Sequence, residues 1–451
     1  DAINGQEFTG STDAQLVTYS IQEADGTAID SGTGFNNARS EGVSLAFDPD
    51  TDQFIIAFSD GNNATRGTIR IGTLSGTTIT LGDKIVTNTD HTGVVATGCH
   101  YDKINDRLIV TQFDPYSIYS GTGGVYATAF KLHASTARTV ETQGTTTQVF
   151  ETSSGTGVSN NNLSEIQDHD GVVDVLYEDR SDGNDNYVKT VKINDASACS
   201  LTISSGAEFD TDDNNFFGIA YSPDEDKNVV LYTNGNDLRA RTITHFSGNP
   251  SLGSYASYNL LNCKLDATED RGGRTMIYDT EHNKFHFLYR YDGSSSSNAV
   301  NDNLYIGNLS ISGTSVTFAS TGNPGTTMNN TVEISDLKYG RHQGSNYPSA
   351  GLVYSHQRQR IIMTGNSTSG ESSGNRKFHV IDFNGSAYTK SSSPIDIWTA
   401  SGAPWYSGFI RSDDDSGIFG SVNLYAYFIY GGSNDGKTFL QGIDAGDSTI
   451  S

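Results

Sequence analysis

A strand–turn–strand phrase recurs along this chain and constrains its fold more than any other feature. One clear copy, SLAFDPDTDQFIIAFSD at residues 44–60, has two apolar runs on either side of an Asp-rich turn. The segment that follows, residues 67–86, alternates apolar and polar residues across a Ser-Gly turn. Four short strands in about fifty residues are the sequence signature of one propeller blade.

Five further copies keep this form, and a looser one follows near the C-terminus. They occupy residues 99–114, 164–179, 218–234, 275–291 and 351–366, with the looser copy at 408–421. Near-continuous apolar runs predict inner strands covered on both faces, and the alternating hairpins predict half-exposed outer strands. We therefore predict an all-β fold, a single β-propeller of seven four-stranded blades.

The same pattern predicts how the ring closes. A hairpin at residues 14–32 precedes the first copy, and only a short strand candidate at residues 437–446 follows the last. We expect the N- and C-terminal segments to pair in the final blade, which removes open sheet edges. The chain is then one domain, 1–451, with blades at residues 41–92, 93–155, 156–212, 213–268, 269–342, 343–402, and 403–451 with 1–40.

The charge balance narrows the class of partner. The chain has 53 acidic and 28 basic residues, a formal net charge of −25. Nucleic-acid binding relies on clustered Lys and Arg, so we expect no nucleic-acid partner. The longest apolar runs have strand length, so we expect no membrane insertion.

The first turn contains a candidate metal site. Asp48, Asp50 and Asp52 have the alternating spacing with which carboxylates can surround calcium. The loop is short and lacks a downstream bidentate Glu, which favours an ordinary hairpin turn; calcium is the one cofactor left open. His282 and His286 are four residues apart, about 13 Å along a strand, so we do not expect them to act together.

Aromatic residues near irregular segments are the candidate binding residues. Tyr116 and Tyr119 lie in an insertion within the second blade, and Trp405 and Tyr406 precede the expected inner strand at residue 408. Aromatic faces stack on sugars and anchor interfaces, although packing between blades is the alternative. No nucleophile elbow, Walker loop, HExxH motif or dinucleotide fingerprint is present, so we assign no catalytic residue.

The phrases FDPDTDQFIIAFSD and LSISGTSVTF (residues 309–318) resemble repeat units of propeller proteins in marine bacteriophage virions. The resemblance covers two blades well and the others by form alone. It implies a non-enzymatic tail, fibre or capsid-surface protein at a virion surface or in an extracellular setting. Its expected partners are other virion proteins and a host surface glycan or protein receptor. The alternatives are a secreted carbohydrate-active enzyme, either a glycosidase or a lyase, and a purely structural assembly module.

Overall fold

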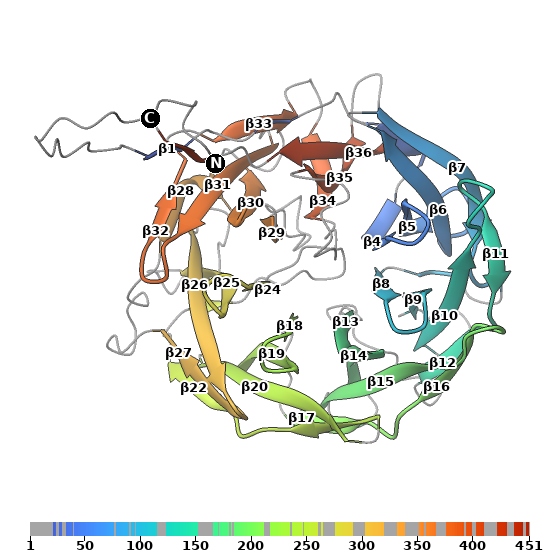
Figure 1. Ribbon diagram of the computed structural model, residues 1–451, viewed down its shortest axis with the longest axis horizontal. Helices are drawn as coiled ribbons and strands as arrows, with labels where there is room; N and C mark the ends of the chain where they lie inside the picture. Colours follow the sequence, from blue (N-terminus) through green and yellow to red (C-terminus); the bar gives the residue numbers. More distant parts are fainter. Residues whose placement is uncertain are drawn as a thin grey trace, which may run out of the picture.

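Antiparallel strands arranged as a ring make up the computed structural model of this protein (Figure 1). The structure describes residues 21–23, 27–28, 33–38, 40–75, 78–89, 92–94, 96–114, 123–151, 166–169, 171–179, 182, 185–211, 217–234, 237–246, 248–259, 263–264, 276–291, 303–319, 332–338, 351–355, 358–366, 376–391, 394–398, 403–409, 422–430, 437–444 and 448–450. Among these residues, no helix has the length and apolarity that a membrane span requires.

The first sheet shows the repeat unit in its simplest form. It comprises β4 (Ser40–Asp48), β5 (Gln53–Asp60), β6 (Arg66–Ser75) and β7 (Thr78–Val86), paired in that order. All eight residues of β5 are buried because sheets cover both of its faces, whereas β7 is largely exposed or half-buried. The predicted contrast between inner and outer strands is therefore present.

The next three sheets repeat this order. The second contains β8 (Ala96–Asp102), β9 (Arg107–Asp114), β10 (Gly124–Leu132), β11 (Val140–Gln143) and β12 (Thr147–Glu151). The third contains β13 (Ile166–His169), β14 (Val172–Asp179), β15 (Asp185–Asp195), β16 (Ser200–Ile203) and β17 (Ala207–Asp210). The fourth contains β18 (Phe217–Ser222), β19 (Lys227–Asn234), β20 (Asp237–Phe246), β21 (Asn249–Leu252) and β22 (Ala256–Asn259).

These three sheets have five strands rather than the predicted four, because the outermost strand is divided in two. β11 and β12, for example, both pair with β10. Gly144 lies at that division and donates a backbone hydrogen bond to Ala129, and Gly253 does the same to Thr242 in the fourth sheet. The first sheet has a register shift between Arg70 and Gly72 instead. Interruptions of this kind bend an outer strand so that it follows a twisted sheet.

The fifth and sixth repeats belong to one eleven-stranded sheet. It contains β23 (Cys263–Lys264), β24 (Met276–Asp279), β25 (Lys284–Tyr291), β26 (Asn303–Ser312), β27 (Ser315–Phe318), β28 (Val332–Lys338), β29 (Gly351–Ser355), β30 (Arg360–Asn366), β31 (Arg376–Phe383), β32 (Tyr388–Lys390) and β33 (Ile395–Trp398). The two halves are joined by a single residue pair, Lys338 with Asn366. The ring thus consists of six hydrogen-bonded sheets, not the seven separate blades we predicted.

The closing sheet joins the two ends of the chain. It comprises β34 (Ala403–Phe409), β35 (Val422–Tyr430) and β36 (Lys437–Asp444), and the N-terminal strands β2 (Thr27–Ala28) and β3 (Thr33–Asn36) pair with β36. A separate ribbon pairs β1 (Ile21–Glu23) with β37 (Ser448–Ile450). Closure by the two termini is confirmed, although β3 lies beyond the hairpin we expected. The looser copy at residues 408–421 was misplaced, because its second strand is β35.

Three of the seams between adjacent sheets combine an apolar core with a half-buried cation. Between the closing and first sheets, Phe35 packs edge-on against Phe58 with ring centroids 5.2 Å apart. The Arg70 guanidinium donates to the Gly82 carbonyl at 2.8 Å and to the Phe35 carbonyl, across the seam, at 2.8 Å. Burial lowers the pKa of Arg70. This residue therefore connects the first sheet to a backbone carbonyl that β3 leaves free in the seam.

Equivalent cations connect two other seams. Arg241 donates to the Gly253 carbonyl at 2.9 Å and to the Phe209 carbonyl, on the third sheet, at 2.8 Å. Lys189 donates to the Val149 carbonyl of the second sheet at 2.9 Å. Its ammonium also lies over the Phe150 and Tyr177 rings, 5.7 Å and 5.8 Å from their centroids. We call Arg70, Lys189 and Arg241 the seam cations.

Candidate functional site

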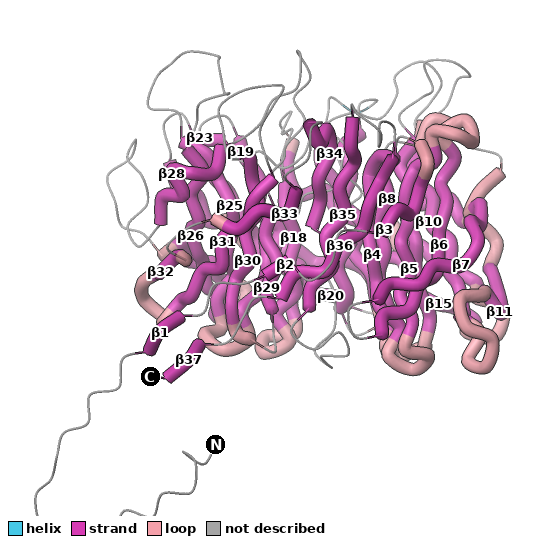
Figure 2. The backbone as a smooth tube through the Cα atoms, turned by 90° about the horizontal axis from the view of Figure 1, so that it is seen from above, coloured by secondary structure: helices cyan, strands magenta, loops and turns pink. Residues whose placement is uncertain are grey.

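The ring has two ends, which differ in the connections that they carry. We call the end with the inner hairpin turns, residues 49–52, 103–106, 223–226 and 280–283, the turn face. The opposite end, where β9 ends at Asp114 and β10 begins at Gly124, is the insertion face. Most described turns lie along the lower edge of the ring in Figure 2. The connections of more than five residues between second and third strands all belong to the insertion face.

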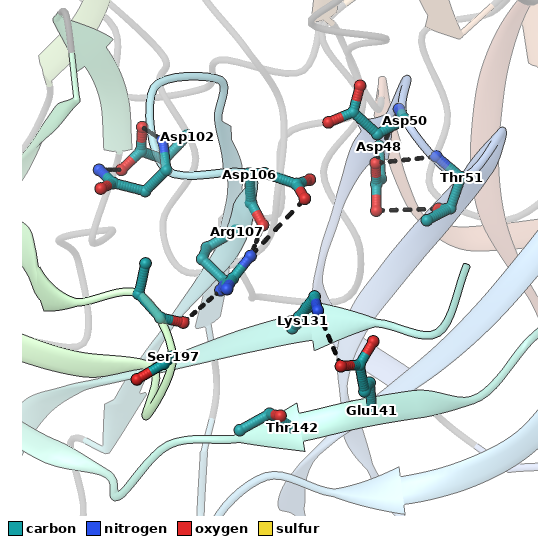
Figure 3. Close-up of polar contacts among 12 residues, drawn as sticks. Asp48, Asp50, Thr51, Asp102, Asp106, Arg107, Lys131, Glu141, Thr142 and Ser197 are labelled. Carbon is teal, nitrogen blue, oxygen red and sulfur yellow. Dashed lines mark hydrogen bonds and ion pairs between the residues drawn. The ribbon is translucent and has the colours of Figure 1, made fainter.

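The turn face is built from one repeated turn. In five repeats a residue with φ between 51° and 56° lies four positions after the inner strand ends: Asp52, Asp106, Asp226, Asn283 and Gln359. Asp and Asn tolerate this left-handed conformation better than most residues. In three of these repeats the inner strand ends in a carboxylate, Asp48, Asp102 or Asp279, that accepts hydrogen bonds from its own turn. Asp48 accepts them from the backbone of Asp50 and Thr51 and from the Thr51 hydroxyl (Figure 3).

The candidate calcium residues lie in this turn, and Asp48 uses both carboxylate oxygens within it. Asp50 accepts a hydrogen bond from Tyr101 of the second sheet at 3.2 Å, and Asp52 is exposed. The Tyr101 hydroxyl also lies 3.0 Å from Asp106, so its single hydrogen is shared between the two carboxylates. Burial raises the pKa of Asp48 and of Asp106, and neighbouring carboxylates add to both shifts. No group of three His, Cys, Asp or Glu side chains suited to a metal occurs in the part of the chain that the structure describes.

His282 and His286 converge on one carboxylate, which corrects our expectation that they are too far apart. His282 Nδ1 lies 2.8 Å from Asp279 Oδ2, and His286 Nε2 lies 3.2 Å from the same oxygen. His286 Nδ1 meets the Tyr388 hydroxyl at 2.7 Å, and Asn308 donates to that hydroxyl at 3.0 Å. The tautomer that fits these hydrogen bonds has the hydrogen on Nε2, so His286 donates to Asp279 and accepts from Tyr388.

The surroundings lower the pKa values of both Asp279 and His286. Burial alone would raise the pKa of Asp279, but hydrogen bonds from His286 and His282 hold it well below its usual value. Burial lowers the pKa of His286. The carboxylate is therefore ionised and the imidazole neutral at neutral pH. His286 is fully buried and the His282 side chain is 20% exposed, and the cluster joins the fifth and sixth repeats.

The insertion face contains the two strand ends that flank the predicted binding loop in the sequence. Tyr116 and Tyr119 lie outside the described residues. The strands on either side are described: β9 ends in the buried Asp114, and β10 begins at Gly124, opposite Glu151 of β12. Acidic side chains also end the second strands of the first and third sheets, at Asp60 and Asp179. Asp60 is paired with Lys84 at 2.8 Å and lies opposite Arg66 of β6, so the acidic character of these strand ends comes from Asp114, Glu151 and Asp179.

Gln112, two residues before the end of β9, interrupts the repeat. The equivalent residue is aromatic in four other repeats, Phe58, Tyr177, Tyr232 and Tyr289, and each is buried in a seam. Gln112 is 2% exposed, and neither Oε1 nor Nε2 has a hydrogen-bond partner among the described residues. Its amide lies against Gly67 of the first sheet, where an added Cβ would be 2.2 Å from Nε2.

Polar residues continue from Gln112 across the second sheet. Its strand neighbours in register are Thr97 on β8 and Tyr126 on β10. The Thr97 hydroxyl contacts the Gly42 carbonyl and lies 3.0 Å from the Ala57 carbonyl. Burial, with Glu151 and Asp114 nearby, raises the pKa of Tyr126 to about 12, so its hydroxyl stays protonated. The insertion-face half of this seam is thus polar, whereas the turn-face half is apolar (Cys99, Leu108, Val110).

The second pair of candidate binding residues does not lie on a loop. Trp405 and Tyr406 belong to the inner strand β34, where Tyr406 pairs with Phe428. The register shifts between Pro404 and Tyr406, so Trp405 occupies an irregularity within the strand. Our placement of Trp405 and Tyr406 before the inner strand was therefore wrong. They also belong to a different sheet from the strands that flank residues 115–122.

Sequence reasoning missed Gln112, although a signal for it was present. When the strand–turn–strand copies are aligned on their turns, LIVTQFD has Gln where FIIAFSD and NVVLYTN have Phe and Tyr. A polar residue at a buried position that is aromatic in the other repeats lowers stability locally, and such positions are often functional.

Together these features define a single all-β propeller with an acidic face that carries long insertions. No protein-family model matches the chain, and no curated protein matches it. Solved structures with similar architecture include the propeller domain of Cps50 (Swd1) from Myceliophteria thermophila, with 10% identity and a TM-score of 0.44 over 94% of this chain and 99% of that chain.

Two other similar structures belong to different functional classes. The N-terminal domain of Nup159 has 11% identity and a TM-score of 0.41, over 94% of this chain and 96% of that chain. The NanB sialidase from Streptococcus pneumoniae has 9% identity and a TM-score of 0.47, over 95% and 71%. Likenesses at this level carry no argument about function, which must come from the chain's own residues.

Proposed function

We propose that this protein is a non-enzymatic recognition propeller that binds a surface glycan through its insertion face. Gln112 is the observation that supports this proposal most directly. The Gln112 amide is buried without a hydrogen-bond partner among the described residues, which lowers stability, so its place in the strand that precedes residues 115–122 is better explained by binding than by folding. The contact residues in this proposal are Tyr116 and Tyr119 of the same insertion, with Trp405 and Tyr406 as candidates elsewhere in the ring.

The charge of the insertion face favours a neutral ligand. Asp114 and Glu151 would repel an anionic polymer, whereas carboxylates accept hydrogen bonds from sugar hydroxyls. Asp60 is already paired, with Lys84 at 2.8 Å. The net charge of −25 gives the same preference at long range.

The resemblance of the repeat phrases to virion propellers supports a setting for this activity. In this proposal the protein is displayed on a virion surface, in a tail, fibre or capsid decoration, where its partners are other virion proteins and a host glycan or receptor. We further propose that the eleven-stranded sheet represents two repeats, β24–β27 and β29–β32, which gives a ring of seven. The single Lys338–Asn366 pair between its halves supports this count.

A glycan array tests the proposal. We expect binding to neutral host-surface glycans without sugar release, and loss of binding in the Tyr116→Ala/Tyr119→Ala double variant. Tyr255→Ala is the matched control, because Tyr255 is 53% exposed and lies on the outer edge of the fourth sheet. Binding unchanged in the double variant would exclude this loop, and release of reducing sugar would show an enzyme instead. Cryo-electron microscopy of the native particle tests the virion setting.

A further inference from the structure

Gln112 occupies a position where the fold would be more stable with another residue. The seams at Phe58, Tyr177 and Tyr232 show the alternative, an aromatic ring packed against a ring of the preceding sheet. Desolvating a carboxamide without a hydrogen bond destabilises a protein, whereas burying an aromatic ring stabilises it. A residue that breaks the local rule in this way is characteristic of a functional site.

The surroundings are arranged around this amide. Gly67 faces it, and any side chain there would overlap the amide, since an added Cβ would lie 2.2 Å from Nε2 and 2.7 Å from Oε1. Tyr126, in register with Gln112, is buried and protonated, and its ring extends toward Gly124, where an added Cβ would be 2.9 Å from the hydroxyl. Donor and acceptor groups thus extend from Gln112 to the insertion-face end of β10.

We propose that Gln112 determines ligand specificity by binding two adjacent hydroxyls, a vicinal diol, of a neutral sugar ring. This inference depends on the proposed glycan-binding function and deepens it. A carboxamide presents one acceptor and one donor side by side, and a vicinal diol presents a matching pair: one hydroxyl donates to Oε1 and the other accepts from Nε2. A secondary amide such as an acetamido group fits less well, because its N–H and C=O point in opposite directions.

The neighbouring carboxylates select against charged sugars. Asp114 ends the same strand, and Glu151 faces Gly124 across β10 and β12. A uronic or sialic acid would bring its carboxylate against both. Because Gln112 is 2% exposed and lies against Gly67, the diol can reach it only when the seam between the first and second sheets opens locally, which predicts association slower than a diffusion-controlled encounter.

The Gln112→Met variant separates a binding role from a structural one. Methionine has a similar shape without the polar atoms, so we expect the melting temperature to rise by about 1–3 °C while affinity for an array-selected neutral glycan falls at least tenfold. Gln143→Met is the matched control, since Gln143 lies on β11 of the same sheet and its amide donates to the Thr87 carbonyl at 3.1 Å. It should leave affinity unchanged.

A second measurement uses the unaltered protein. Each array hit is compared with the same glycan after periodate oxidation and borohydride reduction, which cleaves vicinal diols and leaves isolated hydroxyls. We expect oxidised glycans to lose binding and uronate-containing glycans not to bind. If oxidised glycans bind as before, or if Gln112→Met lowers stability and leaves affinity intact, the diol assignment is wrong and glycan binding stands. If no glycan binds, the proposed function and this inference both fail.

Discussion

The seam cations provide an internally matched test of how the sheets are joined. Replacing each by Met keeps most of the apolar stem and removes the hydrogen bonds. Arg70→Met and Arg241→Met each remove two bonds from a charged donor to a carbonyl, and one of the two crosses the seam. Lys189→Met removes one such bond and its contacts with two aromatic rings. The structure therefore predicts an order of effects as well as a size.

A hydrogen bond to a charged group contributes about 1.5–3 kcal/mol. Because these side chains are partly exposed, we take the lower end and expect each arginine variant to lose about 3 kcal/mol. For Lys189→Met, one bond and a cation–π contribution of about 0.5 kcal/mol give about 2 kcal/mol. With an unfolding entropy of about 2.1 cal/mol/K per residue, the 451-residue chain should melt about 3 °C and about 2 °C lower, respectively.

Differential scanning calorimetry at a fixed scan rate measures these shifts. Lys131→Met is the control, because Lys131 forms only a surface ion pair, 2.7 Å from Glu141, and should leave the melting temperature unchanged. The Arg70→Met/Arg241→Met double variant should show additive losses, since the two residues lie in different seams. If the arginine variants match the control, or if Lys189→Met costs more than either, the seam hydrogen bonds do not hold the sheets together as described.

Two further predictions concern the other polar clusters. Because the pKa of Asp279 and that of His286 are both lowered in the folded protein, the unfolded chain binds more protons in acid, so stability should fall as pH drops from about 6.5 to 5, with a further loss below about pH 4. Between about pH 6.5 and 5, the unfolding free energy of His286→Gln should depend less on pH than that of the unaltered protein, by at most about 1.4 kcal/mol per pH unit. The melting temperature measured against pH should then fall less steeply for the variant. Parallel curves for the two proteins would contradict a neutral, buried His286. For the first turn, Asp48 already has internal donors, so we expect addition of EDTA or of calcium to leave the melting temperature unchanged; a clear rise with calcium would show a metal site there.

The parts of the fold that sequence predicted are those that local chemistry determines. Six strand–turn–strand copies are found as predicted, because each carries its own turn residues, such as Asp52 and Asn283 in left-handed backbone. The final copy was misplaced because residues 410–421 separate β34 from β35, a longer connection than in the other copies. The convergence of His282 and His286 was missed since strand spacing ignores a third residue, Asp279, on the neighbouring strand.

The candidate site was harder to predict for a physical reason. The aligned repeats show that Gln112 replaces an aromatic residue, but its contact with Gly67 joins two different sheets. The sequence therefore shows neither the seam nor the absence of hydrogen bonds to this amide among the described residues. The number of sheets depends in the same way on one pair, Lys338 with Asn366, that joins segments from two repeats.

The ribbon between β1 and β37 determines how the ring would respond to mechanical load. Ile21 pairs with Ile450, and Glu23 pairs with Ser448, so the outer ends of both strands lie together. Tension applied at Ile21 and Ile450 would break the residue pairs of this ribbon one after another. Sequential breaking requires less force than shearing all pairs at once. The load would next reach β36, to which β3 is paired, before any strand of the first four sheets. The closing sheet would thus unfold first under load. The insertion face between the first and second sheets would stay intact while the closing sheet unfolds.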